Sequence, residues 1–187
     1  MIEGVDRRHL LISGFSSARI KDPKAVLGIL RESFPRVEVQ LMRADRIAGT
    51  EHLSFATLNA VRAFGRKYKR SRSLAMEILL YASCQRQISK AIELLGVTSA
   101  TRQVGVAALS TRIAVLEDLQ EALRKLLGGR VDDGVLEIRT NRKLSGLRRV
   151  FGILDRELEA SRQGGEGDAE VVKRLVIERS ALLALEG

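Results

Sequence analysis

The sequence predicts a single α/β (α+β) domain spanning residues 1–187, in which a small mixed sheet of three to four strands is covered by about seven helices. The length of 187 residues matches roughly one domain. The composition, 45% hydrophobic and 29% charged, is typical of a folded chain with a core and excludes a disordered or fibrous one. Short strand-like runs also alternate with longer amphipathic segments.

The predicted strands are short runs with few charges. Residues 37–41 alternate apolar and polar side chains, which indicates a strand with one buried face. Residues 104–109 are continuously apolar and suit a central strand. Two further strands are expected, so that the full set lies at residues 9–15, 37–41, 104–109 and 135–138.

The predicted helices carry apolar residues at three- and four-residue spacing. Asp22 and Pro23 supply an N-cap and a first-turn proline for the first helix. Residues 74–82 are apolar almost all round, which places that helix in the core. The expected helices lie at residues 23–34, 49–67, 74–82, 88–95, 112–127, 141–158 and 169–185.

Several classes of site are excluded by composition. One cysteine and two histidines cannot make a Cys/His zinc site or an internal disulfide. The longest apolar run, residues 78–82, is far shorter than the ~20 residues that span a bilayer. No secretory leader pattern opens the chain. Together with the lone thiol, these features lead us to expect a soluble cytoplasmic protein without metal or cofactor.

The positive charge is concentrated in the first half of the chain. Residues 1–90 hold 17 Lys and Arg against 8 Asp and Glu, whereas residues 91–187 hold 15 of each. The whole net charge of +9 therefore precedes residue 91. This asymmetry favours a polyanionic partner, and nucleic acid before membrane. The alternative is a solvated basic face.

No catalytic constellation is evident. The chain lacks a phosphate-binding glycine loop and a nucleophile elbow. Cys84 has no histidine near it in sequence, which indicates an inert thiol. His52 and His9 are expected to be structural, and the pair Asp132 and Asp133, followed by glycine, is typical of a turn. These observations point to a binding protein with no catalytic residues.

The most informative segment is the polar break at residues 83–87, between two predicted helices. Gln85, Arg86 and Gln87 place two amides and a guanidinium near a helix N-terminus, where donors suit phosphate oxygens or base edges. In the alternative interpretation, the two glutamines only satisfy the interhelical turn.

Four motifs stand out along the chain: GTEHL at residues 49–53, AMEILLYASCQRQI at 75–88, DDGVLEI at 132–138 and IERSALL at 177–183. Together they resemble the kinase-binding, tRNA-recruiting subunit of the KEOPS complex in its archaeal form. The likeness covers nearly the whole chain, and the QRQ segment is its most specific part. Cys84 stands where members of that family usually have glycine, which permits a left-handed backbone.

The resemblance implies a non-catalytic subunit of the machinery that attaches threonylcarbamoyl to adenosine in tRNA. It implies direct binding to the small atypical kinase/ATPase subunit, indirect contact with other KEOPS subunits, and recruitment of tRNA by its 3′ CCA end. We expect Gln85, Arg86 and Gln87 to contact the RNA end. The residues expected to steer its backbone are Lys67, Lys69, Arg70 and Arg72.

The expected kinase surface lies on the last helix. Its stripe of Leu175, Leu182 and Leu183 is predicted to face the core, with Leu185 near the rim. Apolar side chains in excess of one stripe favour a partner contact, so Leu182, Leu183 and Leu185 are the expected interface residues. In the alternative, this helix simply completes the core.

Two other functions remain open at this point. The chain could be a small enzyme acting on a nucleotide or RNA, with an acid/base pair around Asp132, Asp133 and His52. It could also be a purely structural subunit whose basic face keeps it in solution. If the protein binds tRNA in a way that depends on salt and on Arg86 and does not turn over ATP, it is the tRNA-recruiting subunit, and neither the enzyme nor the purely structural subunit.

Overall fold

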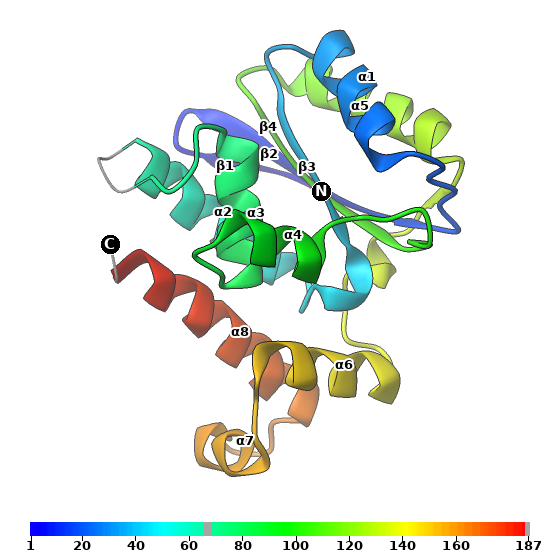
Figure 1. Cartoon of the computed structure of the whole chain (residues 1–187). Coiled ribbons are helices and arrows are strands. Elements are labelled where there is room, and N and C mark those ends of the chain that lie inside the picture. Colours follow the sequence, from blue (N-terminus) through cyan, green and yellow to red (C-terminus); the bar gives the residue numbers. More distant parts are fainter. Residues whose placement is uncertain (66–68, 186–187) are drawn as a thin grey trace.

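An antiparallel sheet lies at the centre of the computed structural model, which describes residues 1–65 and 69–185 (Figure 1). Its strands are β1 (Ile2–Val5), β2 (Arg8–Ser16), β3 (Glu38–Arg43), β4 (Val104–Ser110) and β5 (Arg130–Val131). The order is β1-β2-β4-β3, and β5 pairs with the end of β2. The predicted α+β class is confirmed. Within the described residues every pairing is antiparallel, so the expected mixed pairing is corrected.

Three of the four predicted strands are present, and the fourth is wrong. Residues 135–138 form no strand; a 3-10 helix, η2, occupies Asp133–Val135 instead. The Asp132 side chain accepts from the Gly134 amide at 3.1 Å, and the Asp133 carboxylate accepts from the Gly14 amide at 2.7 Å. A Cβ atom on Gly14 would clash with the Asp132 carbonyl oxygen, so only glycine permits this approach.

Helices cover both faces of the sheet, and all seven predicted helical regions contain helix. In chain order the α-helices are α1 (Pro23–Ser33), α2 (Thr50–Phe64), α3 (Leu74–Ser83), α4 (Ile88–Leu95), α5 (Ile113–Leu127), α6 (Asn141–Phe151), α7 (Asp155–Ser161) and α8 (Asp168–Leu185). A short 3-10 helix, η1, follows β3 at Ala44–Arg46. Helices α1 and α5 pack on one face, and α2, α3 and α4 pack on the other (Figure 1).

The predicted helix at residues 141–158 is divided in two. Gly152, with φ of +64°, ends α6 in the left-handed conformation, and α7 begins at Asp155. Because the chain turns here, Leu154 is 53% exposed, whereas Leu158, which belongs to α7, is buried. The glycine stop signal therefore overrides the regular apolar spacing that runs through it.

Helix α8 packs against α2 and α3, which cover the sheet, and also against the later helices α6 and α7. It carries the centre of a third apolar cluster, in which Val171, Val172 and Val176 are fully buried. No helix in the described ranges combines the length and the apolarity needed to cross a bilayer.

A polar segment after β5 ties α2 to α6. The Glu137 carboxylate accepts from the Thr50 amide at 2.9 Å and from its hydroxyl at 3.1 Å, which caps the start of α2. The Lys143 ammonium donates to the carbonyls of Val135 at 2.7 Å and Leu136 at 2.6 Å. Burial lowers the pKa of Lys143 to about 8, although the Glu137 carboxylate opposes that shift. We call residues 132–143 the clasp.

Candidate functional site

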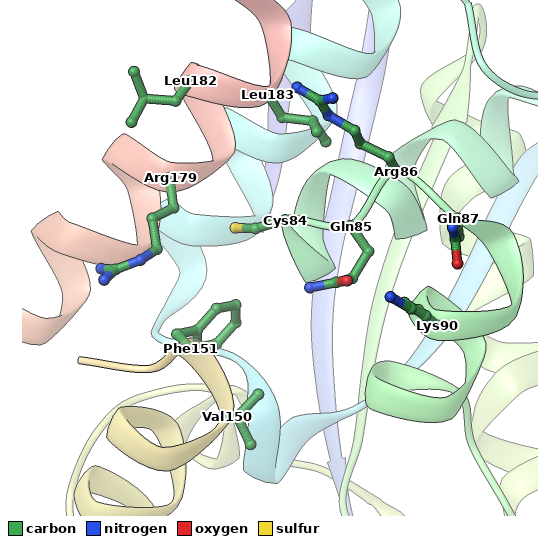
Figure 2. A pocket seen from close by; sticks show the side chains of 10 residues that line it. All are labelled: Cys84, Gln85, Arg86, Gln87, Lys90, Val150, Phe151, Arg179, Leu182 and Leu183. Carbon is green, nitrogen blue, oxygen red and sulfur yellow. The ribbon is translucent and has the colours of Figure 1, made fainter. Parts of the chain in front are cut away.

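A pocket of about 510 Å³ opens where α3, α4, α6 and α8 meet (Figure 2). It is lined by Cys84, Gln85, Arg86, Gln87, Lys90, Val150, Phe151, Arg179, Leu182 and Leu183. The predicted break at residues 83–87 thus forms one wall. The opposite wall comes from segments more than 60 residues later in the chain.

The break is shaped by the way α3 ends. Cys84 adopts the left-handed conformation, with φ of 53° and ψ of 33°. The amide of Gln85 then donates to the Leu80 carbonyl at 3.0 Å, which closes the last turn of α3. Helix α4 begins after Gln87 without a side-chain cap. Two helix ends therefore lie next to each other beside the pocket.

The pocket wall is cationic and rich in donors. Arg86, Gln87 and Lys90 are exposed, and Gln85 is half-buried. The side-chain Nε2 of Gln85 donates to the Ser83 carbonyl at 3.4 Å, so this glutamine also stabilises the turn. Arg179 contributes a third positive charge from α8, and Glu157 accepts from its Nη2 at 2.8 Å. None of the described lining residues is acidic.

Cys84 is held as an unreactive thiol. Burial raises its pKa to about 12, although the positive charge of Arg179 opposes that shift. The Sγ atom lies 3.7 Å from the Val176 carbonyl oxygen, to which it can donate. The thiolate that nucleophilic chemistry requires is therefore disfavoured at neutral pH.

The family of the chain follows from comparison with known proteins. The family described as kinase binding protein CGI-121 matches residues 18–183. The chain belongs to the CGI-121 family. It is also 30% identical to the regulatory protein Cgi121 of Methanocaldococcus jannaschii over 180 residues, which cover 95% of this chain and 99% of that protein. The predicted likeness to a kinase-binding family is confirmed.

The described residues of the predicted basic loop of this CGI-121 chain do not line the pocket, although Arg70 contacts Leu183, which does. Lys67 is outside the described residues. Lys69 and Arg72 are exposed, and the Lys69 ammonium lies 5.0 Å from the centre of the Phe64 ring. Arg70 donates to the Leu183 carbonyl at 2.8 Å and to the Tyr81 hydroxyl at 3.4 Å. Arg70 therefore holds its loop against α3 and α8.

The expected partner leucines of the CGI-121 chain differ in exposure. Leu182 is 54% exposed at the pocket rim, so its predicted place in the core stripe is wrong. Leu175 and Leu183 are buried, as that stripe predicted. The side chain of Leu185 is outside the described part. The pocket lining therefore includes three of the expected RNA residues, Gln85, Arg86 and Gln87, and two of the expected partner residues, Leu182 and Leu183.

Besides Cys84, which was expected to be inert, four lining residues were missed by sequence reasoning. Lys90 lies one turn after the QRQ segment, and Arg179 lies inside the IERSALL motif, so both were within reach of a helical-wheel argument. Val150 and Phe151 enter because α6 stops at Gly152, for which that glycine was the available signal. In Figure 2 these side chains come from elements on both sides of the pocket.

The residues of the alternative enzyme hypothesis hold backbone groups instead. His52 is fully buried; its Nδ1 accepts from the Ala48 amide at 3.2 Å, and its Nε2 faces the Ala82 carbonyl at 2.9 Å. Burial lowers the His52 pKa to about 4, so the ring is neutral at physiological pH. Asp132 and Asp133 shape the turn at η2. Across the described ranges, no three His, Cys, Asp or Glu side chains gather as a metal site.

Proposed function

We propose that this CGI-121 protein is a non-catalytic, cytoplasmic subunit of the KEOPS complex. It binds the small atypical kinase/ATPase subunit and recruits tRNA through the 3′ CCA end. Its effect on modification comes from holding tRNA near a separate catalytic subunit, which raises the effective concentration of the substrate. The observation that carries this proposal is the cationic pocket at the α3–α4 break.

The chemistry of the pocket supports an RNA end as its ligand. Arg86 and Lys90 supply positive charge for phosphates, while Gln85 and Gln87 offer the donor and acceptor pairs that base edges require. The charge of Arg179 is offset by its ion pair with Glu157. A volume of about 510 Å³ lies within the usual range of small-ligand sites. An unpaired 3′ end can enter such a site, because its bases are not held in a duplex.

Family membership supports the kinase partner. The match is to a kinase-binding family, and the archaeal relative is described as a regulatory protein. Leu182 gives α8 an exposed apolar side chain beside the pocket. Exposed apolar patches commonly mark a partner site, and we place the centre of the proposed patch at Leu182.

The RNA part of the proposal is tested by Arg86→Glu. Reversing this charge should weaken binding of intact tRNA by at least tenfold and lower the salt dependence of binding, because a phosphate contact is replaced by repulsion. Gel shift or fluorescence anisotropy at several salt concentrations measures both quantities.

The matched control is Arg31→Glu, which makes the same charge change on the exposed side of α1. It should bind tRNA within about twofold of the unmodified protein. Removal of the CCA end should weaken the unmodified protein as much as Arg86→Glu does. Equal affinity of Arg86→Glu and the unmodified protein for intact tRNA would reject the pocket as the RNA site.

A further inference from the structure

Three connections meet at the end of the sheet where β2 finishes and β4 begins. The Ala18 amide donates to the Arg102 carbonyl at 2.9 Å, and the Arg19 amide donates to the Leu127 carbonyl at 2.8 Å. Arg130 of β5 pairs with Ser16. In Figure 1 these connections lie at the right of the view, whereas α8 lies at the lower left.

Close backbone packing fixes the relative positions of these connections. A Cβ atom on Gly129 would lie 2.5 Å from the Ser16 carbonyl oxygen and 3.3 Å from the Ala18 nitrogen. Only glycine permits this approach, so the segment after α5 lies directly against the segment after β2. The backbone positions from which the side chains of these segments project are therefore fixed relative to one another.

Four of these side chains are cationic and exposed: Arg19, Lys21, Arg102 and Arg130. We call them the basic loop surface. Nowhere in the described ranges does an ion pair join any of them to a carboxylate. Arg102 donates from Nη1 to the Ser99 carbonyl at 2.9 Å.

The nearest acidic side chains in sequence are engaged elsewhere. Asp22 caps α1 by accepting from the Lys24 amide at 2.8 Å, and Asp132 accepts from the Gly134 amide at 3.1 Å. Asp133 accepts from the Gly14 amide at 2.7 Å, and Glu121, on α5, pairs with Arg124 at 2.8 Å. The positive charge of the basic loop surface is thus left for an external anion.

The composition of these loops favours phosphate over bases. Residues 17–22, 97–103 and 128–131 contain no aromatic residue on which a base could stack. Arginine is suited to phosphate because its planar guanidinium donates two parallel hydrogen bonds. A surface of this kind positions the nucleic-acid backbone and carries no sequence preference.

We propose that the basic loop surface binds the phosphate backbone of double-stranded RNA, at a place separate from the pocket at the α3–α4 break. This inference rests on the proposed role in RNA recruitment and adds a second contact to it. The pocket accepts an unpaired end, and the loops accept a duplex stem. Two separate contacts on one RNA would lengthen its residence on the protein.

The test uses the full chain and two RNA probes. One probe is a blunt-ended duplex of about one helical turn, and the other is a short single strand ending in CCA. The triple variant Arg19→Glu, Arg102→Glu, Arg130→Glu should bind the duplex at least tenfold more weakly. The slope of log affinity against log salt should fall by about two. Binding of the single strand should stay within about twofold.

The matched control is Arg36→Glu, Arg62→Glu, Arg112→Glu, at three other exposed arginines. Both triple variants lower the formal charge from +9 to +3, so a net-charge effect alone would weaken duplex binding equally in both. That equality would overturn the proposal. Unchanged duplex binding in the first variant would overturn it too, and loss of kinase co-purification with duplex binding intact would assign the surface to a protein partner.

The outcomes for the two sites are distinguishable. Loss of duplex binding with no effect of Arg86→Glu on the single strand would support the basic loop surface and reject the pocket. If the unmodified protein does not bind the duplex, the basic loop surface is rejected whatever the single strand does. Circular dichroism and thermal unfolding verify the fold, and the corresponding Arg→Gln triple replaces the first variant if it does not fold.

Discussion

Cys84 holds a backbone conformation that costs least for glycine. Its φ of 53° places a Cβ atom in the left-handed region, where L-residues with side chains are disfavoured by about 1–2 kcal/mol. The sulfur offsets part of this cost, because it packs with the apolar cluster around α8 and lies near the Val176 carbonyl. The geometry expected for a glycine at this position is thus retained with a cysteine.

Comparing Cys84→Gly with Cys84→Ala isolates the backbone cost, since both variants lose the sulfur and only alanine keeps the Cβ atom. We expect the glycine variant to be the more stable of the two by about 1 kcal/mol in its free energy of unfolding. Urea unfolding measures the difference. An alanine variant at least as stable as the glycine variant would show that the left-handed conformation is not strained.

His52 makes stability depend on pH. Its pKa of about 4 in the folded protein lies below the ordinary histidine value of 6.5, so protonation favours the unfolded chain. The contribution is present above about pH 6.5 and is lost as pH falls toward 4. Between about pH 7.5 and pH 5 we expect the free energy of unfolding to drop by about 2 kcal/mol through this residue.

The His52 contribution is measured as the difference in pH dependence between the unmodified protein and His52→Gln. Chemical denaturation at the two pH values supplies the data. His9→Gln is the matched control, because it removes the other histidine from a partly exposed strand position. The idea fails if His52→Gln loses as much stability on acidification as the unmodified protein does.

At the scale of elements, two consecutive leucines of α8 differ in burial, because one faces the surface and the next faces the core. Leu182 is 54% exposed and Leu183 is 4% exposed. We expect Leu182→Glu to fold normally and to reduce co-purification with the kinase subunit by at least tenfold, because a charge would enter an apolar contact. Quantitative pull-down and thermal unfolding measure the two effects.

Leu154→Glu is the matched control for α8. Leu154 is 53% exposed, almost the same fraction as Leu182, and it lies at the α6–α7 corner. The control should retain kinase binding. A folded Leu182→Glu protein that captures the kinase as well as Leu154→Glu does would place the interface away from this part of α8.

The predicted elements succeeded where local signals agreed and failed where a turn intervened. The Asp22–Pro23 pair placed the start of α1 correctly, because cap and proline act within one turn. The apolar run at residues 135–138 misled, because the hydrogen bonds of Asp132 and Asp133 with distant Gly14 make a 3-10 turn there. Strands β1 and β5 are only four and two residues long, too short for a periodic pattern.

At the scale of the whole molecule, the sequence predicted one wall of the pocket, and it did not predict the opposite wall that α6 and α8 form. The QRQ break could be located because Gln85, Arg86 and Gln87 interrupt two apolar helices within a few residues. Phe151 and Arg179 reach the same pocket through the packing of α6 and α8, which no local pattern encodes. The exposure of Leu182 likewise depends on how α8 docks on α2 and α3.

The clasp has a consequence for the synthesis of the protein. Thr50 receives its capping carboxylate from Glu137, which is 87 residues later in the chain. At about 5–20 residues per second, a ribosome exposes the start of α2 roughly 4–17 seconds before it delivers that partner. During this interval the apolar side of the nascent helix lacks both its cap and the shelter of α8. Ribosome-associated chaperones would therefore meet α2 before its cap and α8 have been made, and a message truncated before codon 137 would yield a product whose α2 lacks the Glu137 cap.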